Sequence, residues 1–144
     1  MDSKKFLLVD DDSEDTELFT EAVEAIDPTV ACLNAMHGKD ALDKLTEQTI
    51  EKPDIIFLDI NMPVMNGWQF LDKLKENEEL KEIPVIMYST SSKKSDLNTA
   101  LSSGAVCFFT KPENFQRLKK ILQIILTYLK NDNISQVCDA IQNA

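Results

Sequence analysis

The chain has 144 residues, with 25 acidic and 15 basic side chains and a formal net charge of -10. This length favours one domain, and the acidity argues against direct nucleic-acid binding, because neutralising phosphates requires a basic patch. No apolar run approaches the roughly 20 residues of a membrane span, and the short run near the start leads into carboxylates rather than a signal-peptide cleavage site. We therefore expect an acidic, cytoplasmic, single-domain protein.

Five short apolar runs alternate with longer amphipathic stretches, at a spacing of about one βα unit. The runs cover residues 6–9, 30–33, 55–58, 85–88 and 105–109. Four are unbroken, as expected for parallel strands covered on both faces, whereas the run at 30–33 is weaker and fits an edge. Helical periodicity follows the runs, around residues 18–26, 41–45, 70–74 and 97–101, and from about 113 to 130. Five βα units in series predict an α/β fold, a doubly wound five-stranded parallel sheet with helices on both faces.

Polar side chains stand directly after four of these runs. They are Asp10, Asp11 and Asp12, then Asp59, then Ser89 and Thr90, and finally Lys111. Ligands of such sheets bind beyond the carboxyl ends of the strands, so these side chains are expected to share one pocket. Clustered carboxylates repel one another, and a hard divalent cation such as Mg²⁺ offsets that repulsion.

A lysine and a hydroxyl beside a cation and a carboxylate suit the binding of a phosphoryl group. Asp59 would act as the nucleophile, as carboxylates do in aspartyl-phosphate chemistry. Lys111 would neutralise phosphoryl oxygens, and Ser89 would donate a hydrogen bond to one of them. Thr90 is the alternative hydroxyl at this position.

Together these residues resemble the receiver domain of two-component response regulators, over about residues 4 to 130. The family's acidic pair matches Asp10 and Asp11, and its Asp-x-x-Met-Pro-x-x-x-Gly signature is present at residues 59–67. The switch hydroxyl matches Ser89, and the Lys-Pro pair matches residues 111–112. The resemblance implies a flavodoxin-like strand order, 2-1-3-4-5.

The resemblance also implies roles for the matched residues. Mg²⁺ would be held by Asp11, Asp59 and the backbone carbonyl of Asn61, with Asp10 contributing through water. Asp59 would take its phosphoryl group from a phosphohistidine on a histidine kinase or a phosphotransfer protein. The chain would be a signalling module that catalyses only its own phosphorylation and dephosphorylation, not an enzyme acting on other substrates.

Further implications concern the switch. Ser89 would move toward the phosphoryl group, and Phe108 would follow it inward, changing the surface of helix four, strand five and helix five. Asn61 and Ser91 would tune the phosphoryl lifetime, which we expect to be minutes because both side chains are small and polar. The peptide bond before Pro112 would be cis, aiming Lys111 inward.

Residues 1–131 are expected to form the receiver domain and residues 132–144 a tail. Apolar residues at helical spacing predict a short amphipathic helix in the tail, lying on helix five or exchanged into a dimer, and Asn133 with Gln136 suggests a capping box. A frayed tail is the alternative. Since only fourteen residues follow Lys130, we expect a stand-alone receiver that docks on a downstream protein that the sequence does not identify. A homodimer through helix four, strand five and helix five is a further possibility.

The sequence contains three cysteines. Cys32, Cys107 and Cys138 are far apart in apolar surroundings, which predicts buried free thiols in a reducing cytoplasm.

Two rival functions are alternatives to the phosphorylated receiver. One rival is a receiver-like adaptor that has lost phosphorylation, although every catalytic position is present. The other is an enzyme on a similar fold, such as a flavin protein or a phosphatase of the haloacid-dehalogenase type, which places a second Asp where this chain has Asn61.

Overall fold

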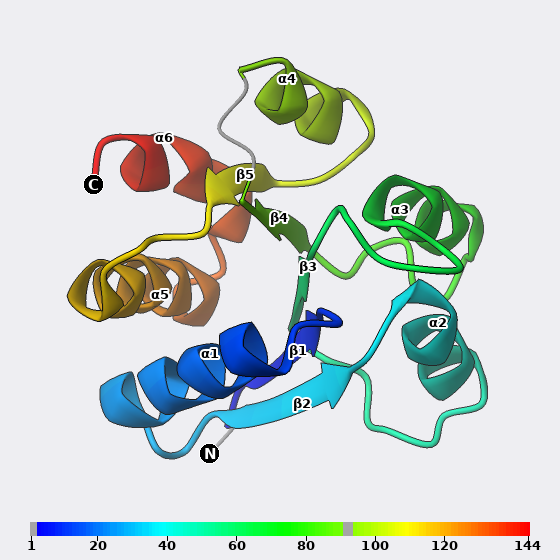
Figure 1. The fold of residues 1–144 in the computed structure, drawn as a ribbon, viewed down its shortest axis with the longest axis horizontal. Helices are drawn as coiled ribbons and strands as arrows, with labels where there is room; N and C mark the ends of the chain where they lie inside the picture. The colour runs from blue at the N-terminus through cyan, green and yellow to red at the C-terminus, as the bar shows by residue number, and fades with distance from the viewer. Residues whose placement is uncertain (1–2, 91–93) are drawn as a thin grey trace.

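The computed structural model describes residues 3–90 and 94–144, and it is built around one parallel sheet (Figure 1). The strands are β1 (Lys5–Val9), β2 (Ala31–Ala35), β3 (Ile55–Leu58), β4 (Val85–Ser89) and β5 (Cys107–Thr110). Their order is β2-β1-β3-β4-β5, and each neighbouring pair is parallel. The predicted doubly wound sheet and its strand order are confirmed. β2 is an edge strand with partly exposed side chains, which explains why its sequence is less apolar than that of the central strands.

Helices cover both faces of the sheet. They are α1 (Ser13–Ile26), α2 (Gly38–Thr46), α3 (Gly67–Glu76), α4 (Lys94–Ser102), α5 (Phe115–Lys130) and α6 (Val137–Gln142). Figure 1 shows α1, α5 and α6 on one side, with α2 and α3 on the other and α4 beyond β5. Among the residues described, no helix is both long and apolar enough to span a membrane.

Each face of the sheet has its own apolar core. Phe6, Phe19 and Phe57 belong to the core under α1 and α5, where the Phe19 and Phe57 rings meet edge-on with their centroids 4.9 Å apart. Leu58, Phe70 and other fully buried residues form the core under α2 and α3. Successive residues of one strand, such as Phe57 and Leu58, therefore point into opposite cores, and both faces fix the ends of the strands in place.

The tail forms a 3-10 turn (Ile134–Gln136) and then the short helix α6, which packs against α5 and β5. Val137 and Ile141 are buried there. The proposed capping box is wrong, because the Asn133 side chain makes no capping hydrogen bond and its Oδ1 is buried without a partner among the described residues.

The expectation of three free thiols is also wrong. Cys107 of β5 and Cys138 of α6 form a disulfide, and their Cα atoms lie 5.1 Å apart. Only Cys32 is free. The pairing arises because α6 folds back onto the edge strand and brings together two cysteines separated by 31 residues in sequence.

Candidate functional site

Three carboxylates meet at the carboxyl end of the sheet. Asp10 and Asp59 are buried, 4% and 6% exposed, while Asp11 is exposed. One oxygen from each of the three lies within 4.8 Å of the others. The sequence-predicted convergence of strand ends is therefore present in the structure.

Backbone hydrogen bonds hold the two buried carboxylates in place. The Asp59 N–H donates to the Val9 carbonyl at 3.0 Å, and the Asp10 N–H donates to the Ala35 carbonyl at 3.1 Å. Asp12 caps α1 by accepting hydrogen bonds from the N–H groups of residues 14 and 15, while its own N–H donates to Asp10 Oδ1 at 3.0 Å. The sheet ladder thus continues one residue past each strand and delivers its aspartate to the pocket.

The loop after β3 fits closely against the backbone of Asp59. Gly67 starts α3, and its N–H donates to the Ile60 carbonyl at 2.9 Å. A Cβ at Gly67 would collide with the Asp59 carbonyl oxygen and would lie 2.9 Å from the Ile60 Cα. Since both contacts are backbone atoms, glycine is required here, and this explains the final residue of the Asp-x-x-Met-Pro-x-x-x-Gly pattern. Asn61 lies in the same loop and is exposed.

Lys111 lies over the carboxylates from the end of β5. Its Nζ is 2.8 Å from Asp10 Oδ2, 2.7 Å from Asp15 Oδ2 and 3.9 Å from Asp59 Oδ2. Its ammonium also lies 5.0 Å from the ring centroid of Tyr88. The described residues contain no cis peptide bond, so the expected cis bond before Pro112 is wrong, although Lys111 does point inward.

Asp15 is the pocket residue that sequence reasoning missed. It lies in the first turn of α1, where the helix dipole also favours a carboxylate. Its carboxylate shares Lys111, which follows β5, with Asp10.

Burial and pairing set the protonation of these groups. Burial raises the pKa of Asp59 to about 6, with Lys111 opposing the rise and Asp10 adding to it. Burial likewise raises the pKa of Asp10, against the hydrogen bond from Lys111. Burial alone would lower the pKa of Lys111, but its hydrogen bonds to Asp10 and Asp15 more than offset this and hold that pKa above its usual value. Lys111 is therefore a fixed positive charge.

The hydroxyl and aromatic candidates lie on or just after β4, the neighbour of β3, and on β5 at the edge of the sheet. Ser89 is fully buried, and its Oγ has no hydrogen-bond partner among the described residues, whereas Thr90 is exposed. Phe108 of β5 is 4% exposed and pairs in register with Met87 of β4. Ser91 lies outside the described residues. Of the two hydroxyls, Ser89 is the buried one that lacks a partner.

These residues fit a divalent cation and a phosphoryl group. Three carboxylates within reach of one point are the oxygen ligands that a hard divalent cation prefers, and their mutual repulsion is relieved when one binds. An unpartnered buried hydroxyl loses a hydrogen bond that it had in water, so Ser89 Oγ is suited to donate to a new oxygen acceptor.

The region that matches a known protein family includes all of these pocket residues. The family model of the response regulator receiver domain matches residues 6–123, and the chain belongs to this family. Chemotaxis protein CheY1 of Helicobacter pylori is 34% identical over 122 residues, which cover 85% of this chain and 96% of that protein. The chain is thus a signalling module of two-component phosphorelays, as the resemblance implied.

Solved structures agree with the sequence match. The Mn²⁺-bound form of response regulator Rcp1 has a TM-score of 0.75 and 30% identity, covering 87% of this chain and 93% of that one. The phosphorylated cyanobacterial phytochrome response regulator RcpA has a TM-score of 0.82 and 28% identity, and the match covers 91% of this chain and 96% of that one. A protein-glutamate methylesterase/protein-glutamine glutaminase of Methanococcoides burtonii is 33% identical, but the match spans only 35% of that protein. Its activity as a whole does not carry over to this chain.

Proposed function

We propose that Asp59 is the phospho-acceptor of this receiver and that Asp10, Asp11, Asp59 and the Asn61 carbonyl hold Mg²⁺. The observation that carries the proposal is the arrangement around Asp59, where two further carboxylates and a fixed lysine charge lie close by. The unpartnered buried hydroxyl of Ser89 stands at the end of the neighbouring strand β4. The Mn²⁺-bound Rcp1 relative supports a divalent cation, and the phosphorylated RcpA relative supports phosphoryl chemistry.

The chemistry would be one in-line transfer. An Asp59 oxygen attacks phosphorus, the P–N bond to the donor imidazole breaks, and the bond electrons stay on the leaving nitrogen, which takes up a proton. The cation, when bound, neutralises charge on the phosphoryl oxygens. Lys111 moves from the Asp15 carboxylate toward the phosphoryl oxygens, and the Ser89 O–H donates to one of them. Water later hydrolyses the acyl phosphate and restores the carboxylate.

The switch would pass through β4 and β5 to the surface. Ser89 ends β4, and Phe108 lies in the neighbouring strand, so a shift of the Ser89 side chain opens or closes space beside the Phe108 ring. The affected surface comprises α4, β5 and α5. We propose that this surface docks a downstream protein or a second copy of the chain, and that a histidine kinase or a phosphotransfer protein supplies the phosphoryl group.

Incubation with Mg²⁺ and acetyl phosphate tests the proposal directly. Intact mass should show the gain of one phosphoryl group, and Trp68 fluorescence should change, because Trp68 lies one residue after Gly67, which contacts Asp59. Asp59→Asn, which keeps the shape of the side chain, should show neither. Uptake by Asp59→Asn would overturn the assignment of the acceptor. Absence of uptake together with absence of cation binding would favour the adaptor function instead.

The lifetime of the phosphoryl group is a separate part of the proposal. Asn61 and Ser91 are small and polar, leaving room for an attacking water, so a lifetime of minutes is expected. The loss of the added mass after removal of acetyl phosphate measures it, and persistence over many hours would contradict this part alone.

A further inference from the structure

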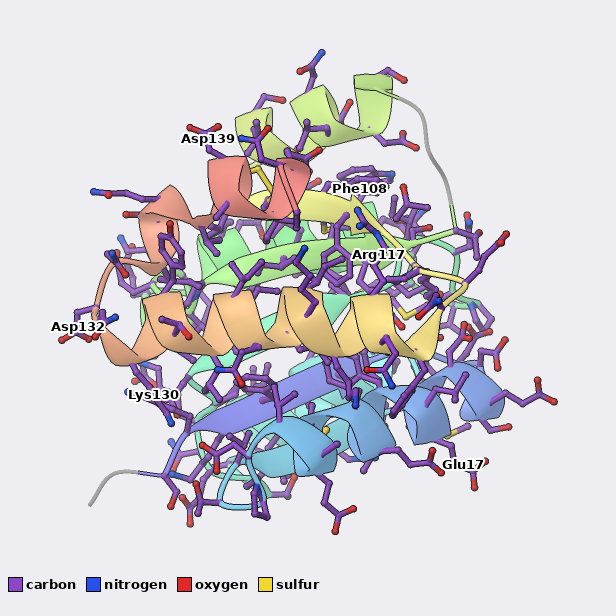
Figure 2. The ribbon with its side chains drawn as sticks, turned by 90° about the vertical axis from the view of Figure 1, so that its left-hand side faces the viewer. Glu17, Phe108, Arg117, Lys130, Asp132 and Asp139 are labelled. Carbon is purple, nitrogen blue, oxygen red and sulfur yellow. A yellow bond between two sulfur atoms is a disulfide. The ribbon has the colours of Figure 1, made fainter. Side chains whose placement is uncertain are left out.

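The tail helix α6 is attached to the receiver by one covalent and several non-covalent contacts, all at the β5 edge or on α5. The disulfide joins Cys138 to Cys107, the first residue of the edge strand β5. The Gln142 side-chain amide donates to the Phe108 carbonyl at 2.9 Å. Val137 and Ile141 are 0% and 3% exposed, packed into the core that α1 and α5 cover. Figure 2 shows α6 lying alongside α5, close to Phe108.

Without these contacts α6 has little to hold it in place. The helix has six residues, and neither it nor the turn before it has a side-chain cap at its start. Isolated helices of this length are not stable in water, because nucleation costs more than one turn of hydrogen bonds returns. The position of α6 therefore depends on its anchors, and the disulfide is the one covalent anchor.

The two cysteines differ in exposure. Cys107 is fully buried, whereas Cys138 is only partly buried, so Cys138 is the half of the disulfide that an external thiolate would attack. The free Cys32 is on β2, at the opposite edge of the sheet from β5, and cannot serve as a local exchange partner. Disulfides in reducing compartments are usually transient and often act as redox sensors.

We propose that Cys107 and Cys138 form a reversible thiol–disulfide site that locks α6 onto the β5 edge, and that a protein or small-molecule dithiol unlocks it. A thiolate of the dithiol attacks the Cys138 sulfur, the Cys107–Cys138 bond breaks, and Cys107 leaves as a thiolate that takes up a proton. The second thiol of the dithiol then attacks the mixed disulfide and releases Cys138 as a thiol. Two electrons and two protons pass to the cysteine pair, and the dithiol ends as a disulfide.

Unlocking would act on the surface that the receiver uses to change shape. A groove of about 490 Å³ lies beside β5, and its lining includes Leu97, Phe108, Lys111, Arg117, Ile141 and Gln142. Ile141 and Gln142 belong to α6. Phe108 is the candidate switch aromatic, and Lys111 is the lysine of the carboxylate pocket. In the locked form α6 itself occupies one wall of the groove, so reduction removes that wall and uncovers the β5 edge.

Hydrogen exchange on the full chain, equilibrated in buffers of reduced and oxidised dithiothreitol, tests the lock. Alkylation in denaturant should count one thiol in the oxidised protein and three in the reduced protein. In the reduced protein, amides of α6 and of β5 should exchange at least about tenfold faster, while β1 and β3 should not change. A pair that stays as thiols in every buffer would overturn the proposal, and so would equal exchange in both states.

Two variants separate the covalent lock from the packing. Cys138→Ser should show the fast exchange of the reduced form in every buffer, whereas Cys32→Ser should behave like the unmodified chain. Gln142→Ala should speed α6 exchange further in the reduced protein and far less in the oxidised protein. If Cys138→Ser fails to fold, the reduced unmodified chain still decides the question. None of these measurements requires Asp59 to be phosphorylated, so the inference stands or falls separately from the proposed function.

Discussion

The carboxylate pocket and the α6 attachment are built in opposite ways. The pocket aspartates continue hydrogen-bonded ladders of the most buried strands, so the positions of Asp10 and Asp59 follow from the sheet itself. The tail helix instead packs outside an edge strand, where a disulfide, two hydrogen bonds from the Gln142 side chain and two buried side chains hold it. A substitution in α6 can therefore leave the geometry of the pocket intact, while a change in the pocket charges alters the stability of the whole fold.

The largest expected effect is at Lys111. Lys111→Met keeps the length of the side chain but removes the charge that offsets Asp10 and Asp59, and we expect phosphoryl uptake from acetyl phosphate to fall by about 100-fold or more. Intact mass against time measures the rate. Lys39→Met, which removes an exposed lysine paired with Asp43, is the matched control and should react at the normal rate. A normal rate for Lys111→Met would mean that the pocket works without its lysine.

The next effect tests the other region. Ile141→Ala removes a buried side chain from α6, and we expect the free energy of unfolding to fall by about 3 kcal/mol, with phosphoryl uptake unchanged. Urea unfolding of the oxidised protein measures the stability. Leu101→Ala, at a half-exposed position of α4, should cost far less. Loss of uptake in Ile141→Ala would show that the two regions are coupled more tightly than their contacts indicate.

The carboxylate cluster should also make the cation-free protein less stable as the pH rises. Asp59 has a pKa of about 6 in the fold, against 3.8 for the unperturbed group, so between these values the folded state holds a proton that the unfolded state has lost. Asp59 thus lowers stability as pH rises from about 4 to 6, and the cost persists at neutral pH. Asp59→Asn should stabilise the cation-free protein by about 2 kcal/mol at pH 7 and reduce this slope. Thermal unfolding of both proteins in chelator, across pH 4 to 8, measures this difference in stability. Asp72→Asn, which neutralises an exposed carboxylate of α3, is the control and should not change the stability at pH 7.

The smallest expected effect is at Asp15. Its carboxylate holds Lys111 at 2.7 Å, while Lys111 lies 3.9 Å from Asp59. Asp15→Asn should release the lysine toward the acceptor and speed phosphoryl uptake by about threefold at saturating Mg²⁺. Glu14→Gln makes the same charge change at an exposed neighbour and serves as the control. A slower rate for Asp15→Asn alone would mean that Asp15 orients Lys111 for the reaction instead of competing for it.

The sequence predicted the parts of the molecule that short patterns encode. Four unbroken apolar runs and one weaker run located the five strands. The polar residues just beyond the runs identified Asp10, Asp59, Ser89 and Lys111, because a parallel sheet brings its strand ends together. Boundaries moved by one or two residues where neighbouring strands extend the pairing, as β2 does by reaching Ala35 opposite Val9.

What the sequence missed depends on contacts between distant segments. Asp15 lies 96 residues from Lys111 in sequence, and only the folded chain brings their side chains together. The 31-residue separation of the two cysteines does not predict a disulfide, since the cysteines come together only when α6 folds back on β5. The Asn133 pattern predicted a helix cap, but Asn133 precedes a 3-10 turn, and its side chain makes no capping hydrogen bond there.

The place of β5 at the edge of the sheet has a consequence for solubility. An uncovered edge strand presents unpaired backbone groups on which another chain can add a strand, and it is a frequent starting point for aggregation. With Gln142 bound to the Phe108 carbonyl and α6 packed alongside, part of that edge is shielded. A tail of a dozen residues would thus act as a guard against sheet-to-sheet association, and a population of molecules with α6 detached would be the one that precipitates first.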